Sequence, residues 1–249
     1  MAVRRICLKI AYDGTNYGGW QQQANAITVQ QCIEENLRAV TGESIKVHAS
    51  GRTDSGVHAR GQIAHFDTNS RIPSEKFALV LNSGLPRDIR ILSSQEVSSD
   101  FHARFNAKRK HYRYTINTAP VADALLRNFQ LHVHAKLDVY AMQQAALFLV
   151  GVHDFSAFMA TGTTIENTVR EIYVSQITFA DELLYYDVTG SGFLYNMVRI
   201  IVGTLLEIGK GKIAAEAMAD IIAKKQRRYA GPTAPPQGLC LMEVEYDLP

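Results

Sequence analysis

Cysteine is scarce in this sequence, and its few cysteines do not have the spacing of a metal site or a disulfide framework. Cys7, Cys32 and Cys240 are widely separated, odd in number and flanked by apolar residues. This pattern is typical of reduced core residues in a cytosolic protein, because disulfides persist in oxidising compartments. We therefore expect a cytoplasmic location without disulfides or a zinc site.

Long apolar runs are also missing, and we expect that the start of the sequence is not a signal peptide. No apolar run reaches the roughly 20 residues that cross a bilayer as a helix. Residues 1–6 run straight into a strand-like alternation, which differs from a signal peptide. With 47% hydrophobic and 20% charged residues, the composition predicts a soluble globular protein without a membrane partner.

The sequence also has none of the motifs that usually bind a cofactor. It contains no glycine-rich Walker loop and no dinucleotide fingerprint. A serine nucleophile elbow is absent as well. His132 and His134 alternate on an extended stretch with no third ligand nearby, which argues against a metal site. We therefore expect neither a cofactor nor a metal.

Net charge is small, at +2, so the total charge neither supports nor excludes a nucleic-acid partner. The distribution of charge is more informative. Basic residues gather in two stretches, 104–113 and 224–228. Each stretch alone is more often a solvated face than a binding site, and the sequence does not show that the two converge.

The stretch with the most polar chemistry is Ser50–Ala59, where Asp54 sits between two glycines with Arg52 two residues before it. The flanking residues alternate like half-buried strands, which predicts a tight loop between two strands. A guanidinium beside a carboxylate favours the ionised acid, which suits a nucleophile better than a general acid. The alternative is a turn whose Asp and Ser cap local amides.

Four separated motifs resemble those of the tRNA pseudouridine synthase A family, and they occur in the family's order across nearly the whole chain. They are GRTDSGVHA at 51–59, AYDGTNYGGWQ at 11–21, FHARF at 101–105 with KHYRY at 110–114, and GSGFLYNMVR at 190–199. The resemblance implies an isomerase that converts uridine to pseudouridine at positions 38, 39 and 40 of the tRNA anticodon stem-loop. It also implies a homodimer that needs no cofactor.

The same resemblance implies roles for particular residues. Asp54 is expected to be the nucleophile that meets a uridine flipped out of the RNA stem. Arg52 is expected to orient Asp54 and to fill the stem as the base leaves. Arg170 resembles a family arginine that reaches the carboxylate; a surface pair with Glu166 or Glu171 is the alternative.

Two further positions are expected to hold the uracil. Tyr112 aligns with the family's substrate-binding tyrosine, and it shares a strand face with Tyr114 while His111 and Arg113 share the other. Aromatic faces with nearby cations commonly hold unpaired RNA, although ordinary sheet packing is the alternative. Leu241 is a candidate apolar wall for uracil, with core packing as its alternative.

The pattern of elements predicts an α+β fold of two ferredoxin-like or RRM-like halves. The first half reads strand, helix, strand, strand, helix, strand, which is the split βαβ order. Thr28, Ser74 and Asp138 are the expected helix caps. The resemblance implies that the halves share a joined, mainly antiparallel sheet with a cleft between them. We expect domains at 1–105, with the Asp54 loop, and 106–249, with Tyr112 and the dimerisation helices.

One element of the second half has two interpretations. An apolar helix is predicted over 193–208, opened by Gly190-Ser191-Gly192. Free amides at a helix N-terminus can hold a phosphate. The same glycines also suit a tight strand-to-helix turn.

Two other functions are compatible with parts of the sequence. A non-catalytic RNA-binding protein with two RRM-like units would need the aromatic and basic strand but not Arg52 and Asp54. A nucleoside hydrolase using Asp54 would release free uracil. Release of tritium from uracil C5 in tRNA separates pseudouridine formation from simple RNA binding.

Overall fold

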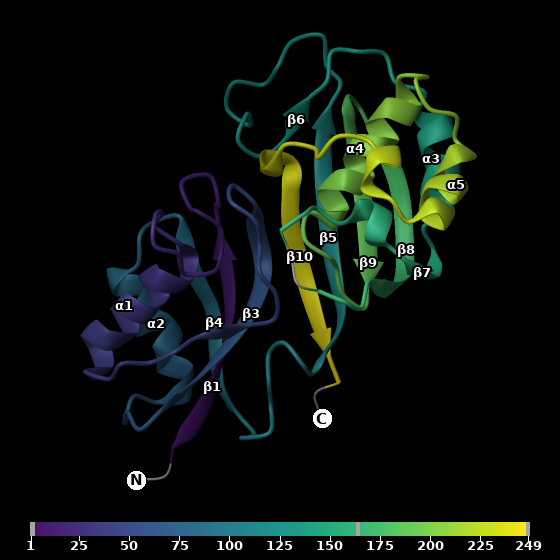
Figure 1. The fold of residues 1–249 in the computed structure, drawn as a ribbon. Helices are drawn as coiled ribbons and strands as arrows, with labels where there is room; N and C mark the ends of the chain where they lie inside the picture. Colours follow the sequence, from purple (N-terminus) through teal and green to yellow (C-terminus); the bar gives the residue numbers. More distant parts are fainter. Residues whose placement is uncertain (1–2, 163–164, 248–249) are drawn as a thin grey trace. The chain divides into compact units, whose positions relative to one another are not determined.

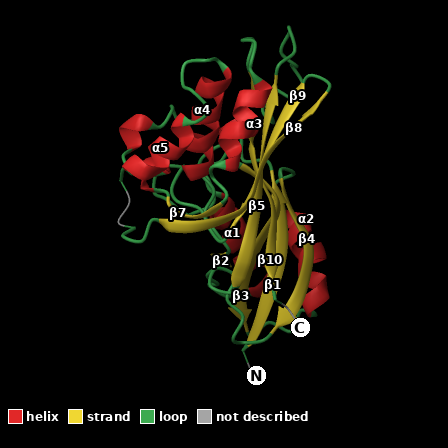
Figure 2. Cartoon of the chain, turned by 90° about the vertical axis from the view of Figure 1, so that its right-hand side faces the viewer, coloured by secondary structure: helices red, strands yellow, loops and turns green. Residues whose placement is uncertain are grey.

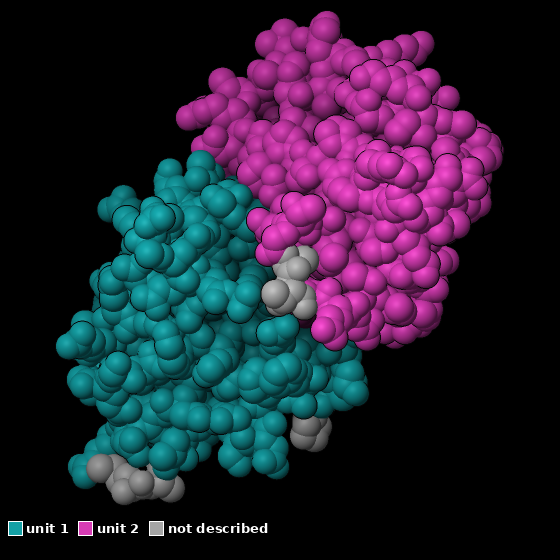
Figure 3. All heavy atoms as spheres, in the orientation of Figure 1, with its two compact units in different colours: residues 1–108, 240–249 teal, residues 109–239 magenta. Residues whose placement is uncertain are grey.

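The structure is a computed structural model that describes residues 3–162 and 165–247, and it divides into two compact units (Figure 3). Unit 1 comprises 1–108 and 240–249, and unit 2 comprises 109–239. The C-terminal strand therefore belongs to the unit in which the chain begins. The domains expected at 1–105 and 106–249 stay a prediction, because compactness does not show which parts fold independently.

Unit 1 is a small sheet with two helices (Figure 1). Its hydrogen-bonded strand order is β4–β1–β3–β10, with β2 beside β3. Neighbours are antiparallel except β10, which runs parallel to β3. The elements are β1 (Arg4–Tyr12), α1 (Val29–Thr41), β2 (His48–Ala49), β3 (His58–Thr68), α2 (Phe77–Gly84), β4 (Ile89–Val97) and β10 (Leu239–Tyr246). The predicted α+β class and split βαβ order are confirmed.

The ends of α1 follow the chemistry of its flanking residues. The Thr28 hydroxyl accepts a hydrogen bond from the Gln31 amide at the N-terminus. Gly42 ends the helix in the left-handed region, at φ 75°. The prediction for α2 was wrong in one respect: Ser74 lies in a 3-10 turn before the helix, and the side chain that accepts from the first turn of α2 is Ser94, whose Oγ is 2.9 Å from the Ala78 amide.

The strand predicted over 45–49 is shorter than its alternation suggests. Only His48 and Ala49 pair with β3. Val47 is buried as predicted, but its amide donates to Glu34 Oε1 over 2.9 Å. A side chain of α1 therefore takes the hydrogen bond that a neighbouring strand would have accepted.

Unit 2 has the strand order β5–β9–β8–β7, all antiparallel, with β6 parallel to β5. Its three helices gather on one side of β8 and β9 (Figure 2). The sequence did not predict β6 or β7. The elements are β5 (Ala107–Asn117), β6 (Leu131–His132), α3 (Val139–Leu147), β7 (Gly151–Asp154), β8 (Val169–Ala180), β9 (Leu183–Gly190), α4 (Met197–Gly209) and α5 (Ala217–Lys224).

The start of α4 corrects the interpretation of the Gly190-Ser191-Gly192 turn. The helix begins at Met197, after Asn196 in a left-handed conformation at φ 60°. The Ser191 amide donates to Glu171 O over 2.9 Å, and the Glu171 amide donates to Ser191 Oγ over 3.1 Å. These groups tie the turn to β8 before the helix starts, so the turn does not present a helix N-terminus to a phosphate.

Candidate active site

The loop that carries Asp54 is held by the backbone of a second loop, at residues 13–20. The Trp20 amide donates to Thr53 O over 3.1 Å. The carbonyl of Tyr17 accepts from the Gly56 amide and from Ser55 Oγ, at 3.3 Å and 3.1 Å. Backbone groups on both sides of Asp54 are therefore fixed. Asp54 itself is half-buried and Arg52 is exposed.

Two glycines allow these loops to come together. Gly19 has φ +90°, and a Cβ built on it would lie 2.5 Å from Thr53 O. A Cβ on Gly14 would lie 2.0 Å from Val57 O. Both distances are too short for any other residue without movement of the backbone. Gly14 and Gly19 of the 11–21 motif are thus explained by the approach of the Asp54 loop, a role that the sequence analysis missed.

Buried side chains of the neighbouring strands form hydrogen bonds with the Asp54 loop. Tyr12 Oη and Thr53 Oγ1 are 2.8 Å apart in a buried hydrogen bond. Burial raises the pKa of the Tyr12 phenol, so it stays neutral. Gln62, on β3, donates to Gly51 O over 2.9 Å and accepts from Ser50 Oγ over 2.6 Å. The loop is therefore anchored at both its entrance and its centre.

The exit of the loop is fixed by β3 and β10. The Gly14 amide donates to His58 Nδ1 over 3.0 Å, which connects the first residue of β3 to the 13–20 loop. Leu241 lies opposite Ala59 in the parallel pairing of β10 with β3. The Leu241 side chain is fully buried, as core packing requires, and its contact with uracil stays a prediction.

Tyr112 of β5 is buried in unit 2, with only 7% of its surface exposed. Its ring meets the ring of Phe193 edge to face, with centroids 5.1 Å apart and planes at 84°. Edge-to-face contact between two aromatic rings is electrostatically favourable. The buried face also contains Tyr114, whose hydroxyl donates to Pro235 O over 2.7 Å. Tyr112 and Tyr114 therefore share one face of β5, as predicted.

The opposite face of β5 carries a charged cluster around Asp187 of β9. His111 Nε2 lies 2.7 Å from the carboxylate, and Arg113 donates to both of its oxygens. Burial alone would favour the neutral acid, but these hydrogen bonds hold the pKa of Asp187 below its usual range. The carboxylate therefore keeps Arg113 and His111 in place on this face.

Arg170 lies near the start of β8, facing the Gly192 turn. Its Nη1 donates to the carbonyls of Asn167 and Val169, at 3.0 Å and 2.6 Å. Burial lowers the pKa of the guanidinium below its usual value. Within the described residues, neither Glu166 nor Glu171 forms an ion pair with it. The structure therefore does not support the alternative of a surface pair.

Several cations of the two basic stretches lie over aromatic rings. The guanidinium of Arg109 is 4.8 Å from the Tyr173 ring centroid, and that of Arg113 is 5.0 Å from Tyr185. In the second stretch, Lys224 and Arg228 both approach the ring of Tyr229. Such contacts orient cations without removing their charge.

Comparison with known proteins identifies the family. The sequence model described as tRNA pseudouridine synthase matches residues 9–106 and 145–247. Proteins named tRNA pseudouridine synthase A from Acetivibrio thermocellus and Ruminiclostridium cellulolyticum are each 50% identical, covering 98% of this chain and 100% of each relative. The one from Halalkalibacterium halodurans is 52% identical over 95% of this chain and 90% of that relative. The chain belongs to the tRNA pseudouridine synthase family.

Members of the tRNA pseudouridine synthase family are isomerases that convert uridine to pseudouridine, and this chain is therefore such an enzyme. The matched residues include Arg52, Asp54, Arg170 and Leu241, whereas Tyr112 lies between the two matched segments. The family assignment supersedes the interpretation as a non-catalytic RNA-binding protein.

The described residues contain neither a metal-binding cluster nor a membrane-spanning helix. Among them, no group of three or more His, Cys, Asp and Glu side chains is arranged to hold a metal ion. In the same part of the chain, no helix is both long enough and apolar enough to cross a membrane. Cys7, Cys32 and Cys240, all within the described residues, form no disulfide.

Proposed function

We propose that this tRNA pseudouridine synthase modifies uridines of the anticodon stem-loop, at positions 38, 39 and 40, with Asp54 as its nucleophile. The observation that carries the proposal is the double backbone anchoring of the Asp54 loop by Tyr17 and Trp20. A carboxylate that reacts with a substrate atom must be held in a fixed position, because a small displacement of a reacting group lowers the reaction rate by a large factor. Isomerisation needs neither a redox partner nor an energy source, so no cofactor is required.

The target uridine must leave the stacked stem before Asp54 can reach it. Extrusion of a base costs a few kcal/mol, which contacts with the flipped base and its phosphates must offset. Tyr112 is proposed to hold the uracil and Leu241 to limit its pocket. The chemical role of Asp54 has three forms: addition to the uracil ring, attack on the ribose, or removal of a ribose proton.

Arg52 and Arg170 are proposed to supply charge. Arg52 is exposed, two residues before Asp54, where a cation can contact RNA as the base leaves. Arg170 is a partly buried guanidinium whose Nη1 donates to two carbonyls, so its positive charge suits an anionic partner. Arg52→Ala should weaken tRNA binding and turnover, whereas Arg87→Ala, at another exposed arginine of unit 1, should leave both unchanged.

A homodimer in the cytoplasm is part of the same proposal. The segment between β5 and β6 exposes several apolar side chains, among them Leu125 with 86% of its surface exposed. Val121, Leu126 and Phe129 of this segment are also exposed. Apolar side chains concentrated in this way mark interaction surfaces. Leu125→Glu should shift the protein from dimer to monomer in light scattering after gel filtration; a wild-type monomer would refute the dimer.

Mapping of modified positions tests the proposed function directly. Unmodified tRNA transcripts would be incubated with the purified protein, and pseudouridines located by carbodiimide labelling and primer extension. We expect stops at positions 38, 39 and 40 of transcripts with uridine there. Modification confined to another arm of the tRNA, or free uracil in the mass spectrum, would contradict the proposal.

A further inference from the structure

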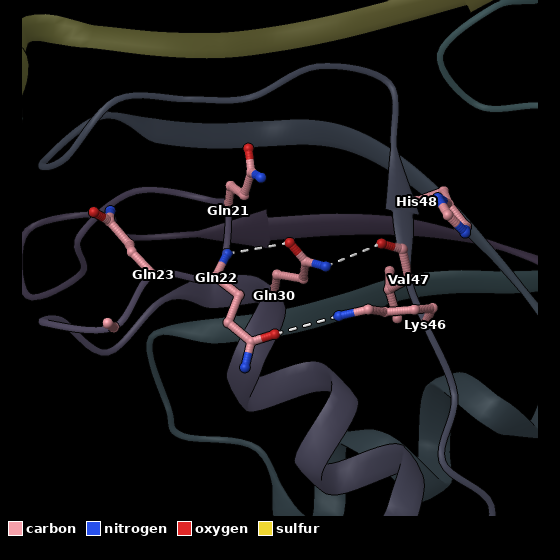
Figure 4. Close-up of a pocket in the computed structure, with 8 residues that line it drawn as sticks. Gln21, Gln22, Gln23, Gln30, Lys46, Val47 and His48 are labelled. Atoms are coloured by element: carbon pink, nitrogen blue, oxygen red, sulfur yellow. Dashed lines mark hydrogen bonds between the residues drawn. The ribbon is translucent and has the colours of Figure 1, made fainter.

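A polar hollow of about 470 Å³ lies in unit 1 between the segment after Trp20, the first turn of α1 and the segment before β2 (Figure 4). Glutamines dominate its lining. The polar residues are Gln21, Gln22, Gln23, Gln30, Lys46 and His48. We call this feature the glutamine hollow. None of these side chains belongs to the Asp54 machinery described above.

The positive charge of the lining is largely offset. Lys46 Nζ lies 3.7 Å from Glu34 Oε2 and 3.4 Å from Gln22 Oε1. The Glu34 side chain is mostly buried and the Lys46 side chain is 69% exposed, so the pair lies at the surface and Glu34 offsets the formal charge of Lys46 without holding it rigidly. Proteins that bind RNA contact its phosphates mainly through Lys and Arg side chains whose positive charge is not already paired with a carboxylate. A hollow lined by neutral amides and a paired lysine suits the uncharged part of a nucleotide better.

The glutamines differ in how far their amides are engaged. Gln30 is structural, because its Oε1 accepts from the Gln22 amide over 3.2 Å and its Nε2 donates to Glu34 Oε1 and Val47 O. Gln23 donates to Gly18 O. Within the described residues, the Gln21 side chain makes no hydrogen bond, and Figure 4 shows its amide beside the hollow. Gln22 uses its oxygen for Lys46 and keeps its NH₂ available.

Free amides match the chemistry of a nucleobase. A glutamine side chain offers a donor and an acceptor together, which is the pairing that base edges present. His48 adds an exposed imidazole ring to the lining, held by stacking on His65 with centroids 5.2 Å apart. Proteins that read unpaired RNA combine flat rings with hydrogen bonds to base edges in this way.

The walls of the hollow continue into the Asp54 loop. Gln21 follows Trp20, whose amide is hydrogen-bonded to Thr53 O. His48 and Ala49 form β2, which leads directly to Ser50. A nucleotide in the hollow would therefore neighbour the nucleotide at Asp54. We propose that the glutamine hollow binds the base of an unpaired nucleotide adjacent to the target uridine, an inference that rests on the proposed function.

The double variant Gln21→Ala/Gln22→Ala tests the inference, with Gln95→Ala, an exposed glutamine on β4, as the matched control. Tritium release from tRNA would give KM and kcat over a series of salt concentrations. We expect KM to rise about tenfold and kcat to stay within about twofold, since the lost contacts are to bound RNA. The dependence of KM on salt should not change, because a base contact displaces no counterion.

Three results would overturn the inference. A KM equal to that of Gln95→Ala means that the hollow does not bind RNA. A salt slope smaller by about one unit means that it binds a phosphate instead. A fall in kcat with unchanged KM means that the substitutions act through the Asp54 loop.

If the proposed function itself were wrong, the result would differ from the three above, because the wild-type protein would release no tritium. The same variants are therefore also compared for tRNA binding by fluorescence anisotropy, which requires no turnover. Equal affinity of the double variant and Gln95→Ala in that assay would overturn the inference independently.

Discussion

The region with the proposed nucleophile and the region with the proposed uracil-binding tyrosine are built in different ways. In unit 1, the position of Asp54 depends on hydrogen bonds between two irregular loops and on glycines that let them approach. In unit 2, Tyr112 is placed by regular pairing of β5 with β9 and by the ring of Phe193. A loop held by backbone contacts tolerates little change, whereas a side chain on a sheet is supported by many neighbours. The position of Asp54 should therefore be more sensitive to substitutions of neighbouring residues than the position of Tyr112.

The largest effect is expected from closing the space between the two loops of unit 1. Gly19→Ala places a Cβ 2.5 Å from Thr53 O, so the Asp54 loop must move. We expect kcat to fall about 100-fold, since displacement of a reacting group by about 1 Å has effects of this size. Single-turnover kinetics with tRNA would measure it.

Gly42→Ala is the matched control for this prediction. Gly42 also has a positive φ, +75°, but a Cβ there meets nothing within 4 Å. The Gly42→Ala variant should therefore be less stable by about 1 kcal/mol, because of backbone strain, and should keep the wild-type kcat. Equal kcat values for the two variants would show that the approach of the loops does not position Asp54.

A smaller effect is expected from the aromatic support in unit 2. Phe193→Ala removes the ring that meets Tyr112 edge to face. Such pairs contribute about 0.5–1.5 kcal/mol, so kcat/KM should fall by up to about tenfold. Phe179→Ala, on β8 with 56% of its surface exposed, should leave kcat/KM unchanged. If both variants match the wild type, Phe193 does not support a substrate-binding tyrosine.

The last effect concerns the pH dependence of stability, not the rate of the reaction, and should be confined to unit 1. His48, His65 and His102 have their rings within 6 Å of one another. Burial, followed by the charges of His102, Arg5 and His48, lowers the pKa of His65 to about 4. The unfolded chain then binds a proton that the folded unit does not, between about pH 6.5 and 4. Stability is fully present above this window and is lost as pH falls through it.

Urea unfolding at several pH values would measure this loss, which should reach about 1.4 kcal/mol per pH unit. The control is His65→Asn, because an Asn oxygen can replace Nδ1 as the acceptor of the Ala103 amide. The free energy of unfolding of this variant should depend less steeply on pH than that of the wild type. Hydrogen exchange should show faster opening of α1 than of α4 at low pH; equal acceleration in both would remove the link to the histidine cluster.

Local chemistry made part of this fold predictable. Thr28 and Gly42 set the ends of α1, and alternation placed β1, β3 and β10. Contacts between distant segments were not predictable from such signals. The shortening of β2 depends on Glu34 of α1, and the late start of α4 depends on the bonding of Ser191 to β8. β7 was missed because four residues carry too little periodicity.

The candidate site shows the same division. The Asp54 loop was predicted from the strands that flank it, and the shared face of Tyr112 and Tyr114 from alternation along β5. The anchoring by Tyr17 and Trp20 was not predicted, because it joins segments about 35 residues apart through backbone atoms that any sequence has. The only signal was the concentration of glycines at 14, 18 and 19.

Substitution of Asp54 by Asn tests the central claim most directly. This change keeps the size of the side chain and removes its charge and its nucleophilic oxygen. Tritium release from tRNA would be measured together with thermal unfolding and tRNA binding. The account predicts that Asp54→Asn unfolds at the wild-type temperature, binds tRNA and releases no tritium. Turnover near the wild-type rate would contradict it.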